Sequence, residues 1–175
     1  MLLRCAAMRA LALAALVWLG SPTFAADDCR GFEWDMTREL ELVRAEASAV
    51  AALSAVVSDA PSVPLDRRLD VALRPAKQVK LEVPPRREPA ADTHAGLVRI
   101  RIPRTASYRV SASQRLWIEV VGPAGAVAST KFTMSGACDA LRKSVVFPLQ
   151  GETDYWIQLS GSPAAEATLV VTADR

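Results

Sequence analysis

Apolar and polar residues alternate along most of the second half of the chain. In residues 97–102 the alternation puts Arg99 and Arg101 on a solvent-exposed face and three branched apolar residues on the other. The same pattern predicts strands at residues 107–113, 116–121, 127–134, 143–149, 154–160 and 167–172. Strands spaced by about 8–12 residues with Gly and Pro between them indicate a mainly β protein, an antiparallel β-sandwich of the jelly-roll kind. We expect no parallel α/β sheet, because no helical crossover separates these strands.

Residues 32–57 predict an amphipathic α-helix packed on this sandwich. Apolar and small residues recur there at spacings of three and four, and Asp35 stands where it caps the first turn. The polar side mixes acidic and basic residues, which favours packing on its own domain over a membrane surface or a partner. The helix falls in an N-terminal segment, residues 26–60.

Prolines punctuate the next segment, residues 61–95. Alternating residues 69–74 and 79–83 predict two short strands, and the prolines beside them confine these to the edges or the ends of a sheet. Residues 84–93 predict a flexible loop. Residues 96–175 form the expected sandwich core, with residues 26–175 as one folded unit.

Residues 1–25 have the pattern of a cleaved signal peptide. Arg4 and Arg9 precede an apolar run of about ten residues, and small residues at Thr23 and Ala25 fit a cleavage site. The run is too short for a membrane anchor, which needs roughly 20 apolar residues, and no cysteine stands in a lipoprotein context. We therefore expect a periplasmic or secreted protein with no membrane span after cleavage.

Loss of this leader leaves a chain without net formal charge. The full sequence has 21 Lys and Arg against 19 Asp and Glu, and two of the basic residues are Arg4 and Arg9. Such a balance gives no electrostatic field for nucleic acid. The two cysteines left, Cys29 and Cys138, favour a disulfide in an oxidising compartment, with two free thiols as the alternative.

Several stretches of the C-terminal half resemble β-sandwich domains of the bacterial pre-peptidase C-terminal type. The resemblance rests on residues 143–147, the turn at residues 150–153 and residues 155–161. Through residues 29–34, Arg38 and Glu39, Cys138, residues 142–145 and residues 159–161, the whole mature chain also resembles small exported proteobacterial proteins of unknown function. Some of these carry the name homogentisate 1,2-dioxygenase, an activity that uses ferrous iron held by two histidines and a carboxylate.

Candidate chemistry is sparse in this sequence. His94 is its one histidine, so the two-histidine ligand set of the dioxygenase cannot be assembled within one subunit. A Ser-His-Asp triad is disfavoured because His94 follows the Pro-rich loop and no Gly-x-Ser-x-Gly motif stands near a strand end, so we expect His94 in a solvated loop. No zinc, calcium or phosphate-loop pattern is present, so no metal, cofactor or catalytic residue is assigned. Carboxylates are the remaining enzyme candidates, as the pairs Glu33 with Asp35 and Glu152 with Asp154, or Glu119.

Aromatic side chains offer a binding hypothesis. Trp117 and Trp156 are candidate ligand-stacking residues, because strand parity puts each on the outward face of its strand; Trp34 and Tyr155 are further aromatics of this kind. The favoured alternative is that the helix at residues 32–57 covers this face and buries both indoles.

Together these patterns predict an exported, non-catalytic β-sandwich protein, an accessory module of the cell envelope that binds another protein or a polysaccharide. The alternatives are an enzyme, as a metal-dependent or carboxylate hydrolase or the dioxygenase named above, and a purely structural subunit of an envelope assembly.

Overall fold

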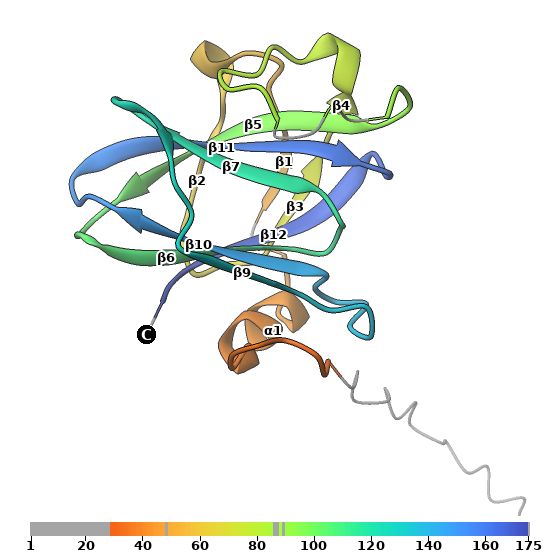
Figure 1. Cartoon of the computed structure of the whole chain (residues 1–175), viewed down its shortest axis with the longest axis vertical. Coiled ribbons are helices and arrows are strands. Elements are labelled where there is room, and N and C mark those ends of the chain that lie inside the picture. The colour runs from red at the N-terminus through yellow and green to blue at the C-terminus, as the bar shows by residue number, and fades with distance from the viewer. Residues whose placement is uncertain (1–28, 48, 86–87, 89, 175) are drawn as a thin grey trace, which may run out of the picture.

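Two stacked β-sheets form the framework of the described part of the chain (Figure 1). The computed structural model describes residues 29–47, 49–85, 88 and 90–174, so the predicted signal peptide lies outside the described residues. Sheet A has the strand order β1 (Ala49–Ala52), β3 (Leu69–Ala72), β12 (Glu166–Ala173), β6 (Ala106–Ala112), β10 (Lys143–Leu149) and β9 (Lys131–Met134). Sheet B has the order β2 (Ser62–Val63), β5 (His94–Ile102), β11 (Thr153–Ser162), β7 (Trp117–Gly122) and β8 (Gly125–Val127), and β4 (Arg74–Pro75) also pairs with β5.

The main core lies between the sheets and follows the alternation in the sequence. Val98 and Ile100 of β5 face Val110 and Phe147 of sheet A within one buried cluster, while Arg99 and its outward neighbour Arg101 are exposed. Each buried branched side chain stabilises the fold by about 1.5–3 kcal/mol relative to its exposed state. The prediction of a mainly β sandwich is confirmed.

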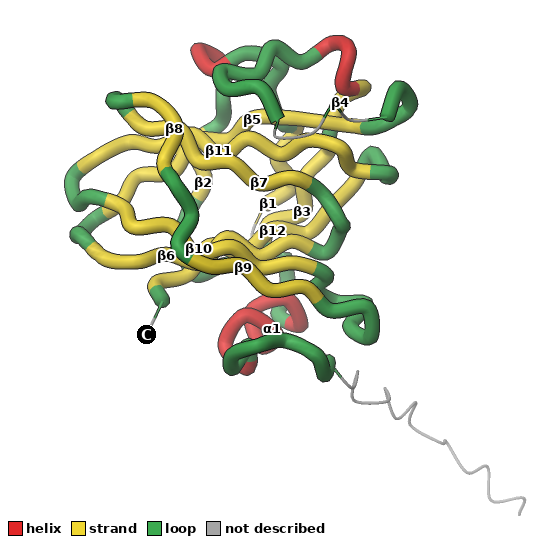
Figure 2. The backbone as a smooth tube through the Cα atoms, viewed as in Figure 1, coloured by secondary structure: helices red, strands yellow, loops and turns green. Residues whose placement is uncertain are grey.

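The helix is much shorter than the sequence predicts. Helix α1 spans Thr37–Arg44, and Asp35 Oδ1 accepts a hydrogen bond from the Thr37 amide at its start. Ala45 is extended and ends the helix, after which β1 pairs with β3 in parallel (Figure 2). The expected helix over residues 32–57 is therefore wrong beyond Arg44, because backbone pairing along β3 outweighs the modest helix preference of an alanine-rich segment.

Three strand predictions also need correction. β3 lies between β1 and β12, so it is no edge strand, and residues 79–83 form no strand. β1 with β3 and β2 with β5 are parallel pairs in an otherwise antiparallel sandwich. The single strand expected at residues 127–134 is divided into β8 in sheet B and β9 in sheet A, with the chain crossing between the sheets in residues 128–130. Two short 3-10 turns, Val57–Asp59 and Ala76–Gln78, complete the described elements.

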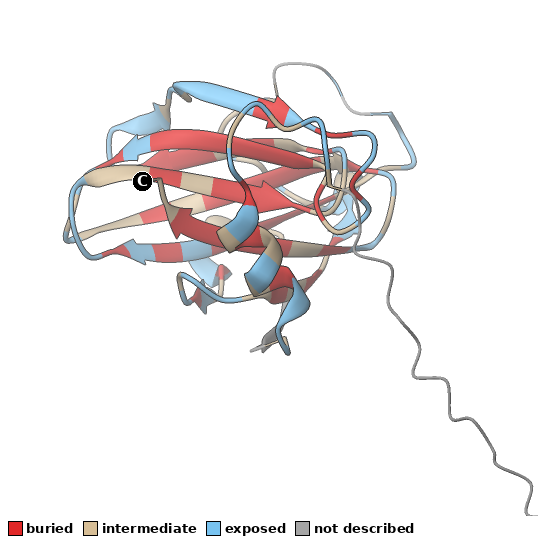
Figure 3. Cartoon of the chain, turned by 90° about the horizontal axis from the view of Figure 1, so that it is seen from below, coloured by how far each residue is buried: buried red, intermediate tan, exposed pale blue. Residues whose placement is uncertain are grey.

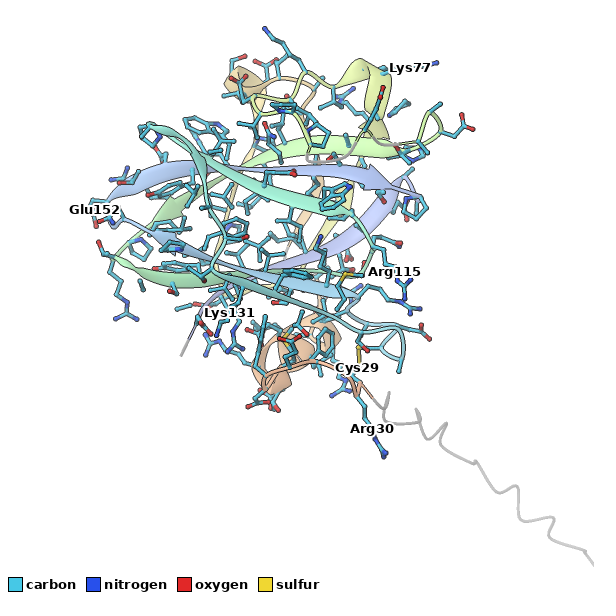
Figure 4. The ribbon with its side chains drawn as sticks, viewed as in Figure 1. Cys29, Arg30, Lys77, Arg115, Lys131 and Glu152 are labelled. Carbon is cyan, nitrogen blue, oxygen red and sulfur yellow. A yellow bond between two sulfur atoms is a disulfide. The ribbon has the colours of Figure 1, made fainter. Side chains whose placement is uncertain are left out.

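A second apolar cluster joins α1 to the outer face of sheet A. Met36 and Val43 pack with Leu141 and Val170, and the predicted disulfide between Cys29 and Cys138 is present within this cluster. Figure 3, seen from the side of α1, shows buried strands beneath a helix whose outward side is exposed. Figure 4 shows Cys29 in the segment that leads into α1. The N-terminal segment is thus fixed on sheet A. Within the described residues, no helix is long and apolar enough to cross a membrane.

Buried charges reinforce this attachment. Glu39 is 1% exposed, and its Oε1 accepts a hydrogen bond of 2.5 Å from the Thr172 hydroxyl of β12. Arg109 of β6 donates to the Asp35 carbonyl at 2.8 Å and to Asp174 at 2.7 Å, and lies 3.4 Å from Glu39. A charge this deeply buried is tolerated only with partners, so Arg109 and Glu39 depend on the docked helix and stabilise its position.

Removing the disulfide should destabilise the protein strongly. The bond spans a sequence separation of 109 residues. In the chain-entropy model, closing such a loop contributes roughly 4–5 kcal/mol to the free energy of unfolding. We expect the Cys29→Ser, Cys138→Ser double variant to unfold at a much lower urea concentration than the oxidised protein, as followed by circular dichroism. An unchanged unfolding midpoint would contradict this role.

Stability should also fall in acid through Asp174. Burial opposes ionisation of Asp174, but hydrogen bonds from Arg109 and Lys131 outweigh it and hold the pKa of the carboxyl below its ordinary value of 3.8. A depressed pKa in the folded state stabilises the fold above the pKa of the unfolded chain, and this contribution disappears as the pH falls below 3.8 through the folded pKa.

We therefore expect Asp174→Asn to lose roughly 1.5–3 kcal/mol of unfolding free energy at pH 7, the usual range for a hydrogen bond to a charged group. Its difference from the wild type should shrink between pH 4 and pH 2. Asp139→Asn is the matched control, because the Asp139 side chain is 81% exposed. A difference between Asp174→Asn and wild type that stays constant with pH would refute the assignment.

Candidate functional site

Trp117 and Trp156 lie on the outer face of sheet B and are half-buried. Their neighbours along the strands, Ile118 and Ile157, belong to the core between the sheets. Helix α1 packs on β12 of sheet A, on the other side of the molecule. The favoured expectation that the helix covers both indoles is therefore wrong, because the apolar side of α1 packs on sheet A and not on sheet B.

Residues 82 and 83 lie over part of the outer face of sheet B instead. Gln158 of β11 is fully buried beneath them: its Oε1 accepts hydrogen bonds from the amides of Glu82 at 2.5 Å and Val83 at 3.2 Å, and its Nε2 donates to the Val83 carbonyl at 3.1 Å. Three hydrogen bonds to one side chain thus fix a segment that has no strand pairing of its own. A buried amide with all these partners is stable only while the segment stays in place.

The residues held by Gln158 separate the two indoles. Trp117 lies opposite Ser160 on β11, four residues along the strand from Trp156, or about 13 Å at the usual rise of a strand. Gln158 and the residues it holds lie between these positions. The candidate stacking residues therefore form no continuous platform, and the structure brings only Trp117 to a groove.

The groove lies at the lateral edge of the sandwich. β8 pairs only with Val120–Gly122, so within the described residues Trp117–Glu119 has no strand neighbour on the side away from β11. A cavity of about 370 Å³ opens there between the two sheets. Its lining is mostly apolar: Val83, Pro84, Trp117, Ile118, Glu119, Val120, residues 126–129, Phe132, Lys143, Val145 and Phe147.

A lysine sits against the indole in this groove. Lys143 is 8% exposed, its Nζ donates to the Leu116 carbonyl at 2.9 Å, and it lies 4.9 Å from the centroid of the Trp117 ring. Such a cation–π contact contributes about 0.5–2 kcal/mol, more when it is shielded from water. Lys143 therefore occupies one face of the indole and orients the ring at the mouth of the groove.

Phe132 forms the outer rim. It lies opposite Val145 in the pairing of β9 with β10, so its side chain is on the core side of sheet A, yet it is 59% exposed. Met134, two residues along the same strand face, is 43% exposed. Among the described residues these two are the exposed large apolar side chains. They are uncovered because sheet B has no strand opposite this part of β9.

The other aromatic candidates have structural roles. The Trp34 ring packs beneath Lys131 at 4.9 Å and Arg109 at 5.8 Å on the outer face of sheet A. Tyr155 is buried in the core, and its hydroxyl accepts a hydrogen bond from the Gln150 amide at 2.9 Å. Tyr155 therefore belongs to the core, and Trp34 contacts the cations on the outer face of sheet A.

His94 and the two acidic pairs lie apart from the groove. Glu119, the remaining acidic candidate, lines it. His94 begins β5, paired with Pro75 and Ser162, and is half-buried, so the expectation of a solvated loop residue is wrong because the strand starts earlier than the alternation showed. Asp35 binds the start of α1, and Arg101 lies between Glu152 at 3.2 Å and Asp154 at 3.6 Å (Figure 4 labels Glu152). In the part of the chain that the structure describes, no group of three or more His, Cys, Asp or Glu is placed to hold a metal ion.

No protein-family model and no curated protein matches this chain. The resemblances to pre-peptidase C-terminal domains and to small exported proteins therefore remain predictions.

Sequence reasoning missed Phe132 and Lys143 as groove residues. Alternation within residues 131–134 does put Phe132 and Met134 on one face, but which sheet the strand joins depends on the crossing at residues 128–130. Lys143 was visible only as the first residue of a strand, and its contact with Trp117 depends on how two sheets stack.

Replacing Gln158 should free the covering segment. Gln158→Met removes the side-chain partners of the Glu82 and Val83 amides and should cost roughly 1–3 kcal/mol of stability, because each lost hydrogen bond contributes about 0.5–1.5 kcal/mol. We expect amide exchange of both residues to accelerate at least tenfold and tryptophan quenching by acrylamide to increase.

Ser160→Ala is the matched control for Gln158→Met. Ser160 is buried two residues away on the same face, and its hydroxyl has no hydrogen-bond partner within the described residues. Equal exchange rates in Gln158→Met and Ser160→Ala would contradict the role of Gln158.

Proposed function

We propose that this protein is an exported, non-catalytic accessory module that binds an apolar segment of another cell-envelope protein in the groove beside Trp117. The observation that carries the proposal is the groove itself, an apolar cavity of about 370 Å³ left open between two sheet edges and rimmed by Phe132. Concave, mostly apolar sites with a few polar groups are the usual form of binding sites.

The lining favours a protein over a polysaccharide. A glycan-binding surface needs flat aromatic faces turned to solvent, and here Lys143 occupies one face of the Trp117 ring while the crossing at Gln158 separates Trp117 from Trp156. Branched and aromatic side chains such as Ile118, Val145 and Phe147 line the remaining space. Apolar side chains of a polypeptide match such walls, and aromatic anchors in pockets are typical of protein interfaces.

The disulfide supports a location outside the cytoplasm, because structural disulfides persist in oxidising compartments. The leader pattern at residues 1–25 supports export through a cleaved signal peptide. We propose a periplasmic or secreted protein on these two grounds.

Blocking the groove tests the proposal. Ala128 is exposed and lines the groove, so Ala128→Trp should fill it without removing any core contact. The mature protein, immobilised, is incubated with extract from the envelope of cells that make it. We expect a bound polypeptide whose retention falls at least tenfold in Ala128→Trp.

Ala165→Trp is the matched control, since Ala165 is exposed in the turn between β11 and β12 and should leave retention unchanged. Retention on a peptidoglycan or polysaccharide column that Ala128→Trp abolishes would replace the protein partner with a glycan. Equal retention of the polypeptide by the wild type and by Ala128→Trp would refute the groove as the binding site.

A further inference from the structure

β9 ends sheet A with an unprotected edge. It pairs with β10 on one side, and within the described residues no strand pairs with its other side. Met134 lies opposite Lys143, so Ser135 and Arg142 are the next pair in this register. The Ser135 amide donates to the Arg142 carbonyl. Hydrogen bonds in an antiparallel ladder involve every second residue. Thr133 therefore pairs with Ser144, and the amides and carbonyls of Phe132 and Met134 point to the open edge.

The side chains of β9 differ sharply between its two faces. Thr133 is buried and its hydroxyl accepts a hydrogen bond from the Glu33 amide, while Lys131 lies 3.2 Å from Asp174 and 4.9 Å from the Trp34 ring. Both are thus engaged with the outer face of sheet A, where α1 packs (Figure 4 labels Lys131). Natural edge strands are commonly protected by a lysine along the edge. Here the lysine is turned away, and Phe132 and Met134 are exposed on the other face.

We propose that β9 pairs antiparallel with β9 of a second copy of this chain, about a two-fold axis through Thr133. A two-fold axis perpendicular to the sheet keeps each face aligned, so residues of equal parity lie opposite each other. With the axis at Thr133, Phe132 of one copy lies opposite Met134 of the other. This register uses the very amides and carbonyls that point to the open edge, and it joins two sheets A into one continuous sheet.

Side-chain chemistry fits this register on both faces. Each exposed Phe132 gains a Met134 sulfur beside its ring, a favourable contact that repeats on the other side of the axis. On the opposite face Lys131 lies across from Ser135 of the second copy, and its ammonium is already paired with Asp174, so no like charges meet. Self-complementarity of this kind favours a second copy over an unrelated strand.

The pairing would also complete the rim of the groove. Phe132 lines the groove, so Met134 of the second copy would border it at the open side. The strand is four residues long, which makes the interface smaller than the roughly 1,200–2,000 Å² typical of stable complexes. We therefore expect a weak dimer, with a dissociation constant on the order of 10–100 µM. Dimer formation does not depend on the proposed function of the groove.

Sedimentation equilibrium of the oxidised mature protein between 5 and 500 µM tests the proposal. The average mass should rise from that of a monomer to that of a dimer, and Met134→Lys should weaken association at least tenfold by placing a charge in the apolar contact. Ala165→Lys, at an exposed residue far from β9 in the sequence, is the control and should associate like the wild type. A monomer at all concentrations, or association unaffected by Met134→Lys, would overturn the proposal.

Disulfide trapping tests the register. Phe132→Cys and Met134→Cys are purified separately, mixed and oxidised, and we expect covalent dimers in the mixture because these positions lie opposite each other. Each variant alone should cross-link far less, since like positions are offset along the strand. Efficient cross-linking of Phe132→Cys alone would contradict the axis at Thr133, and cross-linking equal in all three samples would overturn the specific pairing.

Discussion

The shortness of β8, which pairs with only part of β7, is the constraint from which the candidate site follows. The chain leaves sheet B after only three residues of β8 and enters sheet A as β9. Sheet A thereby extends past the last full strand of sheet B, and part of its core face has no strand opposite. Phe132 is exposed for this reason, and the cavity beside Trp117 lies in the same uncovered region. Exposed apolar surface next to a cavity is unfavourable for an isolated protein, which is why such patches mark interaction sites.

Each outer face of the sandwich is partly covered, and the means differ between the two sheets. On sheet A, the disulfide of Cys29, the apolar side of α1 and the charges around Arg109 hold the N-terminal segment in place. On sheet B, Gln158 holds residues 82–83 by side-chain hydrogen bonds alone. The lateral edge receives neither kind of cover. A rigid frame around an open edge is the arrangement expected for a module that binds another chain, because little order must be gained on binding.

Local patterns predicted the strands well, but they predicted poorly the length of the helix and the contacts between the two sheets. Alternation is a property of single strands, so the core faces of β5, β10 and β11 could be inferred from residues alone. The cysteine pair followed from the compartment that the leader indicates. The length of the helix could not be inferred, because alanine-rich residues after Arg44 fit a helix locally and β3 offers them pairing that only the folded chain contains. The contact of Lys143 with Trp117 was hidden for the same reason, since it depends on the stacking of two sheets.

Photo-crosslinking in cells that export the protein tests directly whether the groove beside Trp117 binds another protein. Benzoylphenylalanine is introduced in place of Phe132 at the groove rim or, as a comparison, in place of Arg101 on the exposed face of β5. We expect an adduct with a polypeptide of different sequence from position 132 and none from position 101, while an adduct of position 132 with a second copy reports only the pairing of β9. Adducts of position 132 with a second copy only, adducts from position 101 alone, or no adducts from either position would contradict binding of another protein in the groove.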